Sequence, residues 1–96
     1  MYKHEIVQKL KTLKPTIWNK YHISSLELFG SSARNEAQEQ SDIDLLVEFS
    51  DTPDLLTFIE LEDSLQKSLG QKIDLVPKRK LKPELKEIIE REAILI

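Results

Sequence analysis

Residues 26–49 read LELFGSSARNEAQEQSDIDLLVEF, and the two apolar runs in this stretch decide the fold. The first run alternates apolar and polar side chains and ends at Gly30, which is typical of a short strand. The second run, from Ile43 to Phe49, predicts a buried strand. Asp42 and Asp44 open this second strand, although carboxylates beside a buried strand need neutralising partners. The pattern therefore predicts that some other group neutralises these two carboxylates.

The remaining segments alternate between helical and strand patterns. Helices are predicted over residues 3–14, 31–38, 53–69 and from 83 onward, and a third strand is predicted over 72–76. Pro15 interrupts the first helical pattern, so residues 16–23 form either a second short helix or an extension. Helices alternating with strands predict an α/β (α+β) fold, with a small sheet of at least three strands flanked by helices. The pattern leaves open which strands run parallel.

The composition bounds the class of protein. The 96 residues are 40% hydrophobic and 32% charged, which is typical of a single domain spanning residues 1–96. The net charge of −3 argues against broad, direct nucleic-acid binding. The absence of cysteine excludes disulfides and thiolate metal sites. No apolar run is long enough to span a membrane and no signal-peptide core is present, so we expect a cytoplasmic protein.

Asp42 and Asp44 are candidate metal ligands and catalytic residues. Side chains alternate across a strand, so the two carboxylates point to the same face, about 7 Å apart along the backbone. Carboxylates this close repel one another unless cations lie between them, and oxygen ligands alone favour Mg²⁺ or Mn²⁺. Asp74 lies in KIDLV, which repeats the DIDLLV pattern on what should be a nearby strand. If Asp74 is in register, the three carboxylates would hold two metal ions for phosphoryl or nucleotidyl transfer.

Gly30, Ser31 and Arg34 are candidate nucleotide-binding residues. Glycine lets the backbone approach a phosphate closely, and a following helix would offer free N–H groups and the positive end of its dipole. The Ser31 hydroxyl can donate a hydrogen bond to the terminal phosphates. Arg34 lies one helical turn later on the same face and could pair with a triphosphate or with an acceptor.

Each of these residues also has an ordinary structural explanation. A glycine that ends a strand and a serine that caps a helix are common turn chemistry. Asp42 alone could be a turn residue, and Asp74 alone a charge at a strand edge. Arg34 could instead pair with local acids, among them Glu36, Glu39 and the site aspartates. The combination favours a functional site, because unrelated surface aspartates need not share a strand face near a Gly-Ser loop.

The set FGSSARNEAQEQSDIDLLVEF followed by KIDLV resembles the minimal nucleotidyltransferases (MNT) of the DNA polymerase β-like superfamily. In particular it is similar to the MntA-type antitoxins of prokaryotic HEPN/MNT toxin–antitoxin pairs. The resemblance covers nearly the whole chain and implies a mixed sheet flanked by helices. It assigns the nucleotide-binding loop to Gly30 and Ser31. Asn35 departs from the glycine that often follows the family's arginine, and Asn tolerates left-handed backbone angles.

The resemblance also implies residue roles and a reaction. Asp42 and Asp44 would be the metal-binding pair, and Asp74 the third carboxylate, which can also receive the acceptor's proton. Related antitoxins transfer AMP from ATP to a tyrosine hydroxyl of a cognate HEPN ribonuclease toxin, with which this chain would form a hetero-oligomer. The alternatives are an antitoxin that masks the toxin without catalysis, or nucleotidyl transfer to a small molecule or an RNA end.

Two further segments stand out. The basic run of residues 78–82 is expected to be a solvated loop that could attract a phosphate-bearing or acidic partner. The apolar sequence AILI, residues 93–96, could add an edge strand, dock on the core or contact a partner.

Overall fold

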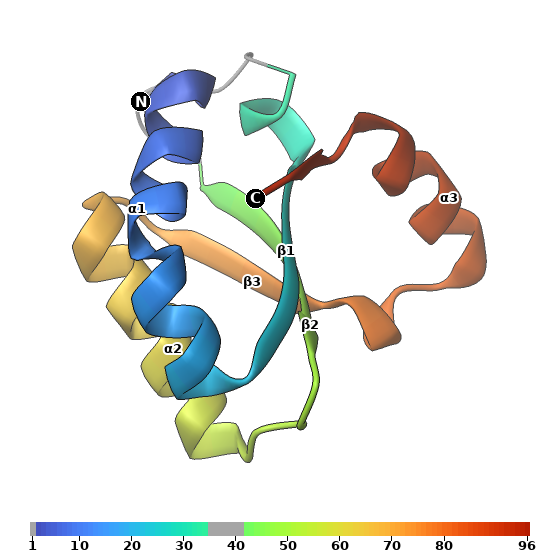
Figure 1. Ribbon diagram of the computed structural model, residues 1–96. Helices are drawn as coiled ribbons and strands as arrows, with labels where there is room; N and C mark the ends of the chain where they lie inside the picture. Colours follow the sequence, from blue (N-terminus) through green and yellow to red (C-terminus); the bar gives the residue numbers. More distant parts are fainter. Residues whose placement is uncertain (1, 35–41) are drawn as a thin grey trace.

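The computed structural model describes residues 2–34 and 42–96. Their elements, in chain order, are α1 (Lys3–Tyr21), β1 (Ile23–Phe29), a 3₁₀ turn η1 (Gly30–Ser32), β2 (Ile43–Phe49), α2 (Leu55–Leu69), β3 (Ile73–Pro77), a second 3₁₀ turn η2 (Lys78–Lys80), α3 (Pro83–Glu92) and β4 (Ile94–Leu95) (Figure 1). The strand order is β3-β2-β1-β4, with β2 parallel to β3 and β1 antiparallel to both of its neighbours. This mixed sheet with its helices confirms the predicted α+β fold. None of the described helices is long and apolar enough to cross a membrane.

Helix α1 runs straight through the position where the sequence predicts an interruption. Pro15 lies inside the helix, so a break there is wrong and the alternative of an extension is right. Proline removes one backbone donor and crowds the carbonyl four residues earlier, but Pro15 and Lys11 are both exposed, where water can replace the donor. Ile17 and Tyr21, beyond the proline, are buried. Their burial favours continuing the helix despite the lost hydrogen bond.

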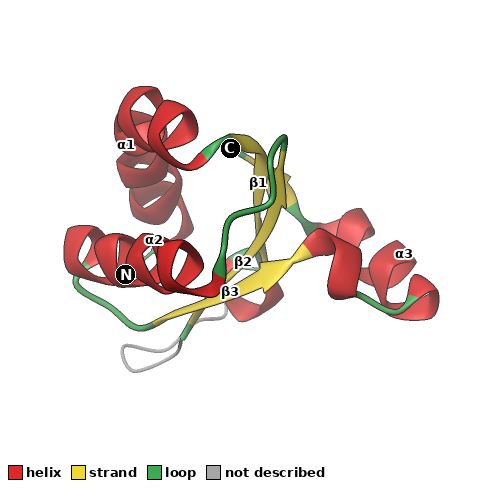
Figure 2. Ribbon diagram, turned by 90° about the horizontal axis from the view of Figure 1, so that it is seen from below, coloured by secondary structure: helices red, strands yellow, loops and turns green. Residues whose placement is uncertain are grey.

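One face of the sheet carries the main hydrophobic core. Figure 2 shows α1 and α2 together on this side of the sheet and α3 apart from them on the other. Alternate side chains of β1, β2 and β3 point into the core, where they meet apolar residues of both helices. The buried set is Ile6, Leu10, Ile17, Tyr21, Ile23, Leu26, Leu28, Ala33, Ile43, Leu45, Val47, Leu61, Leu65, Leu69, Ile73, Leu75 and Ile96. This layer holds the strand register on which the site depends.

The intervening strand residues point to the opposite face, beneath η2 and α3. Asp44, Leu46 and Glu48 alternate along β2 on this face, and Leu46 is buried there, outside the main core. Glu27 of β1 lies opposite Leu46 in the antiparallel register. This face of the sheet therefore has two parts: the end near Asp44 carries carboxylates, and the other end is covered by η2 and α3.

The outer edge of β3 is closed by side chains of α2. The Ile73 N–H donates to Gln66 Oε1 at 3.2 Å, and the Leu75 N–H donates to Glu62 Oε2 at 3.3 Å. Pro77, the last residue of the strand, has no N–H to donate. An edge without free donors cannot extend the sheet by pairing with another chain, which is a common protection of edge strands.

The apolar segment AILI uses two of the three predicted options at once. Residues Ile94–Leu95 form β4, which pairs with β1 on its free side. The Ile96 N–H donates to the Leu26 carbonyl at 2.9 Å, and the Ile96 side chain is buried in the core. Leu95 points to the opposite face and is exposed.

Lys78 shows that the basic run of residues 78–82 is not wholly a solvated loop, so that expectation is wrong at this position. The Lys78 side chain is only 19% exposed, and its Nζ lies 3.0 Å from Glu90 Oε1 and 3.5 Å from Glu27 Oε1. The hydrogen bond that Lys78 donates to Glu90, together with the charges of Glu27, Glu90 and Glu48, raises the pKa of Lys78 against the opposing effect of burial. The ammonium group thus links η2, α3 and β1.

Replacing Lys78 with Met should lower the free energy of unfolding by about 1–2 kcal/mol, because Glu27 would keep its charge in a mostly buried place without a partner. The matched control is Lys82→Met, since Lys82 is exposed and should change stability by less than about 0.5 kcal/mol. Urea unfolding of both variants at pH 7 measures the difference. Equal stability of the two variants would contradict a structural role for the Lys78 pair.

Candidate active site

The register of β2 and β3 brings two of the candidate aspartates side by side. Asp44 lies opposite Asp74 in the parallel pair, and opposite Phe29 in the antiparallel pair with β1. The turn that begins at Gly30 directly follows Phe29, so it lies next to Asp44. Three segments far apart in the sequence therefore meet at one end of the sheet.

Asp44 is the electrostatic centre of this end of the sheet. Partial burial raises the pKa of its carboxyl above the usual value, and the negative charges of Asp74 and Asp42 raise it further. The Arg34 guanidinium acts in the opposite direction but does not cancel these effects. A carboxylate whose charge is disfavoured by both burial and like charges is a favourable place for a cation.

Asp42 lies at the exposed margin of this group. Its Oδ2 atom is 3.8 Å from Lys72 Nζ, and the two side chains are 46% and 75% exposed, respectively. Within residues 2–34 and 42–96, no three His, Cys, Asp or Glu side chains lie close enough together to enclose a metal ion by themselves. Asp42, Asp44 and Asp74 nevertheless offer only carboxylate oxygens, which suits Mg²⁺ or Mn²⁺ that takes its other ligands from water and substrate phosphates.

Glycine is required at position 30 because the Asp44 carboxylate lies very close to its Cα atom. Its φ is +72°, in the left-handed region, and a Cβ atom there would overlap Asp44 Oδ2 and lie 3.2 Å from Asp44 Cγ. A side chain at this position would both strain the backbone and displace the carboxylate. The glycine predicted for phosphate approach is thus also the residue that gives Asp44 its room.

The segment after Gly30 differs from the predicted helix over residues 31–38. The described part forms only the single 3₁₀ turn Gly30–Ser32, in which the N–H groups of Ala33 and Arg34 donate to the Gly30 carbonyl at 3.1 and 3.3 Å. One turn is too short for the helix dipole invoked from the sequence. Residues 35–38, with Glu36 and Asn35, lie outside the described residues, as does Glu39.

Ser32 is a polar residue of the turn that sequence reasoning missed. It is only 1% exposed, and its Oγ has no hydrogen-bond partner among the described residues. Ser31, the candidate phosphate ligand, is half-buried beside it. A buried hydroxyl without a partner is uncommon, and a second serine directly after the Gly-Ser pair was the available signal.

Arg34 contacts a partner that the sequence did not suggest. Its Nη1 donates to Glu92 Oε2 at 2.9 Å, with both side chains about two-fifths exposed. Glu92 ends α3, so this contact joins the Gly-Ser turn to a helix almost sixty residues later. Arg34 also lowers the pKa of Asp44, which places its charge near the site. The structural and ligand roles left open for Arg34 are therefore both compatible with its position.

These features define a class of protein: a small mixed-sheet α+β domain whose carboxylates lie beside a Gly-Ser turn. The sequence matches the family model described as "Nucleotidyltransferase domain" over residues 4–96, so the chain belongs to this family of enzymes. A Methanocaldococcus jannaschii protein assigned as a protein adenylyltransferase is 50% identical over 93 residues, covering 96% of this chain and 95% of that protein. Protein adenylyltransferase MntA of Thermococcus cleftensis is 39% identical, covering 96% and 93%.

Solved structures show the same fold. A protein assigned as a minimal nucleotidyltransferase superposes with a TM-score of 0.84 at 35% identity, covering 98% of this chain and 95% of that one. A toxin–antitoxin structure with AMP-PNP gives a TM-score of 0.70 at 25% identity, covering 99% and 72%. A structure of a tri-AMPylated Shewanella oneidensis HEPN toxin in complex with MNT antitoxin gives a TM-score of 0.60 at 25% identity, covering 97% of this chain and 66% of the matched one. The resemblance to minimal nucleotidyltransferases is confirmed.

Gly30→Ala and Gly70→Ala form a matched pair of variants. Both glycines have positive φ, so each alanine should cost about 1–2 kcal/mol of stability. Only at Gly30 would the new Cβ meet a carboxylate, because no atom lies within 4 Å of a Cβ at Gly70. Nucleotidyl transfer should fall by about a hundredfold or more in Gly30→Ala and remain near wild type in Gly70→Ala. Equal activity of the two variants would show that the Asp44 contact is unimportant.

Asp44→Asn should stabilise the protein at pH 7 in the presence of a chelator. The raised pKa of Asp44 means that the folded state binds more protons than the unfolded state just above pH 3.8, so wild-type stability falls as the pH rises through this window. Asparagine does not ionise, so the variant should not lose this stability, and its Tm should exceed that of wild type at pH 7. The difference in Tm should disappear below pH 3.8, where Asp44 is protonated in both the folded and the unfolded state. Added Mg²⁺ should raise the Tm of wild type more than that of the variant. Thermal unfolding from pH 3 to 7 measures this, and a lower Tm for Asp44→Asn at pH 7 would contradict it.

Proposed function

We propose that the protein is an Mg²⁺-dependent adenylyltransferase that moves AMP from ATP to a tyrosine hydroxyl of a HEPN-type toxin and so acts as its antitoxin. The observation that carries the proposal is the meeting of Asp44, Asp74 and the Gly30 turn at one end of the sheet. Two findings on similar proteins support it: the name of the Thermococcus adenylyltransferase, and the solved complex of an AMPylated HEPN toxin with its antitoxin.

ATP would bind with its phosphates at the turn. Gly30 lets the backbone approach the phosphates, and the Ser31 hydroxyl can donate to a phosphate oxygen. The buried Ser32 hydroxyl, which has no partner among the described residues, can donate to the same group. Arg34 would contribute positive charge to the phosphates if it turned from Glu92, which it contacts now.

The aspartates would supply the chemistry of transfer. Asp42, Asp44 and Asp74 would hold Mg²⁺ or Mn²⁺, which when bound stabilises the negative charge that develops on the phosphate oxygens. The acceptor oxygen bonds to the α-phosphorus of ATP as the bond from that phosphorus to the bridging oxygen breaks. Pyrophosphate leaves, and Asp74, the more exposed of the two paired carboxylates, receives the hydroxyl proton.

The proposed acceptor is a protein because both faces of the sheet are already occupied. The faces of the sheet are occupied by α1 and α2 on one side and by the carboxylates with η2 and α3 on the other. A cognate toxin that presents its own tyrosine would complete the site, in a hetero-oligomer with this chain.

Intact-mass spectrometry of the HEPN-type protein encoded beside this chain's gene tests the proposal. With ATP, Mg²⁺ and wild type, its mass should increase by one or more AMP groups. Asp44→Asn should reduce the rate by about a hundredfold or more, because it removes a ligand charge at nearly equal volume. Asp51→Asn is the control, since Asp51 is exposed at the other end of β2 and should leave the rate unchanged.

Two results would contradict the proposal in different ways. If the HEPN-type protein binds both versions tightly but gains no mass, the chain is an antitoxin that acts by masking alone. If AMP appears instead on an added RNA end or aminoglycoside, the acceptor is wrong while the nucleotidyltransferase chemistry holds.

A further inference from the structure

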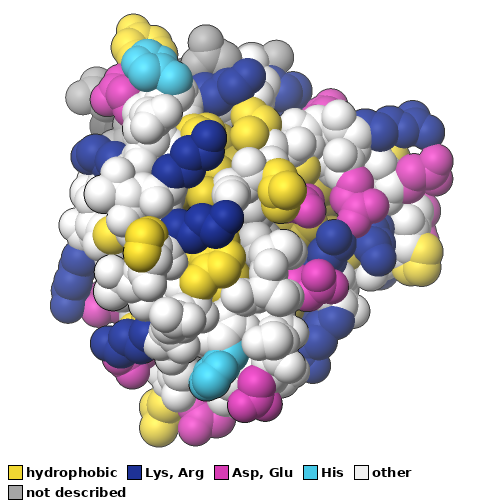
Figure 3. Space-filling model, in the orientation of Figure 1, with side chains coloured by type: hydrophobic (Ala, Val, Ile, Leu, Met, Phe, Trp, Pro, Cys, Tyr) yellow, Lys and Arg dark blue, Asp and Glu magenta, His cyan; other side chains and the backbone are white. Residues whose placement is uncertain are grey.

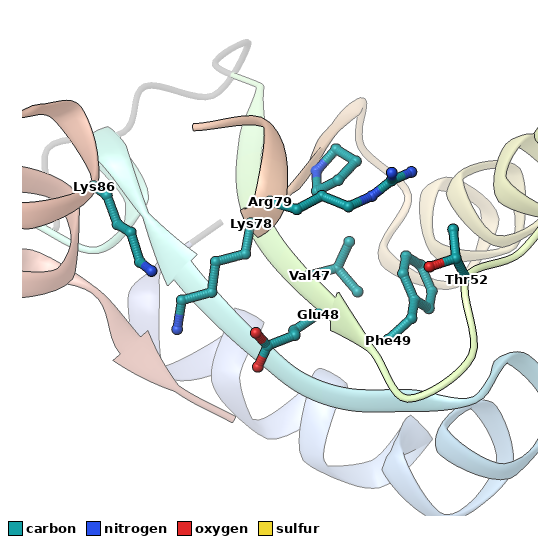
Figure 4. A pocket seen from close by; sticks show the side chains of 8 residues that line it. Val47, Glu48, Phe49, Thr52, Lys78, Arg79 and Lys86 are labelled. Carbon is teal, nitrogen blue, oxygen red and sulfur yellow. The ribbon is translucent and has the colours of Figure 1, made fainter. Parts of the chain in front are cut away.

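The end of the sheet opposite the aspartates carries a hollowed surface. Two adjoining hollows, of about 210 and 380 Å³, lie where β2 and β3 end, and they share Phe49, Pro77 and Arg79. Figure 4 shows Lys78 and Lys86 extending from two different elements toward the side of Glu48, while Arg79 extends toward the side of Phe49 and Thr52. The larger hollow continues over Phe58 and the beginning of α2. The nucleotide site uses none of these residues.

Apolar side chains border this surface without being buried. Helix α2 buries apolar side chains in its second half, but near its beginning Leu55 is 72% exposed and Ile59 is 50% exposed. Leu56, on the same turn, is 79% exposed. Leu55 lines the larger hollow together with Phe58, and Ile59 follows one turn later. A cluster of exposed aliphatic residues beside a hollow is typical of a protein-interaction site.

Most of the basic side chains around these hollows have no acidic partner among the described residues. Within the part of the chain that the structure describes, Arg79, Lys80, Lys82 and Lys86 make no ion pair, in contrast to Lys78. The acidic residues that line the hollows are Glu48 and Asp54. Glu48 acts on Lys78, and Asp54 already caps α2 by accepting from the Thr57 N–H at 2.8 Å. On a chain with net charge −3, this surface therefore has uncompensated positive charge.

We infer that this surface, which we call the η2 surface (Phe49, Leu55, Phe58, Arg79, Lys80 and Lys86), docks an acidic segment of the acceptor protein that also carries apolar side chains. The inference rests on the proposed function for the identity of the acceptor. Apolar side chains of the segment would cover Leu55 and enter the hollow over Phe58, and its carboxylates would pair with Arg79 and Lys80. Such a patch combines an apolar centre with a charged rim, as protein interfaces do.

The position of the η2 surface allows docking and transfer at the same time. Phe49 lies five positions after Asp44 on β2, which is about 16 Å along the strand. A partner held at Phe49 would leave the Gly30 turn open to ATP. Docking away from the reacting atoms would then select the acceptor protein, while the site itself would need to recognise only a hydroxyl group.

A protein segment suits this surface better than a nucleic acid does. Phe49 and Phe58 pack edge-to-face with their ring centroids 6.2 Å apart and are both partly buried, unlike the exposed aromatic rings on which the bases of a single strand stack. Leu55, Leu56 and Ile59 are aliphatic and favour apolar side chains. The net negative charge of the chain also opposes a long polyanion.

Binding of the HEPN-type protein to charge-reversed variants, measured without ATP, tests the inference. Arg79→Glu/Lys80→Glu should weaken binding by about tenfold or more, and Leu55→Ser/Ile59→Ser should weaken it similarly. The matched control is Lys9→Glu/Lys11→Glu, which reverses two exposed charges on α1 and should leave the affinity within about twofold. Equal Tm values would show that all three variants remain folded. Higher salt should weaken the binding of wild type more than that of Arg79→Glu/Lys80→Glu.

The outcomes separate this inference from the proposed function. Wild-type affinity in both η2-surface variants, or no binding by wild type, overturns the docking inference. Loss of binding in those variants, with no AMP transfer by wild type when ATP is added, supports docking and refutes the proposed reaction. If an RNA oligonucleotide of about 20 nucleotides binds wild type but not Arg79→Glu/Lys80→Glu, while the protein partner binds both, the surface serves nucleic acid and the inference is wrong.

Discussion

The parallel pairing of β2 with β3 places the Asp44 carboxylate directly beside Asp74, and most of the site follows from this register. A shift by one residue would turn the aspartates into the core and the core leucines into solvent, because side chains alternate along each strand. The buried neighbours Ile43, Leu45 and Val47 on β2 prevent such a shift. Packing on one face thus fixes the position of charges on the other.

The same pairing creates an unfavourable charge at Asp44, which the side chains of the described residues do not fully neutralise. Burial, Asp74 and Asp42 all raise the pKa of Asp44, and Arg34 is partly engaged with Glu92. Gly30 allows the backbone to lie against the carboxylate rather than shielding it with a side chain. We therefore expect a bound cation and the phosphates of a nucleotide, supplied from solution, to neutralise the aspartates.

The sequence was sufficient for the features that depend on local patterns. The alternation of apolar residues predicted β1, β2 and β3, and the repeated Ile-Asp-Leu pattern predicted that Asp74 would lie near Asp44. Pro15 was misleading because tertiary burial of Ile17 and Tyr21 outweighs a local penalty. The pairing of Lys78 with Glu27 and Glu90, and that of Arg34 with Glu92, join segments far apart in the chain. Local patterns carry no information about such contacts.

Anomalous diffraction from crystals grown with Mn²⁺ and a non-hydrolysable ATP analogue would show whether the aspartates hold the metal. We expect manganese peaks between the analogue's phosphates and the carboxylates of Asp42, Asp44 and Asp74, with the phosphates against the Gly30 turn. Manganese and nucleotide bound elsewhere, with these carboxylates free of metal, would contradict this expectation.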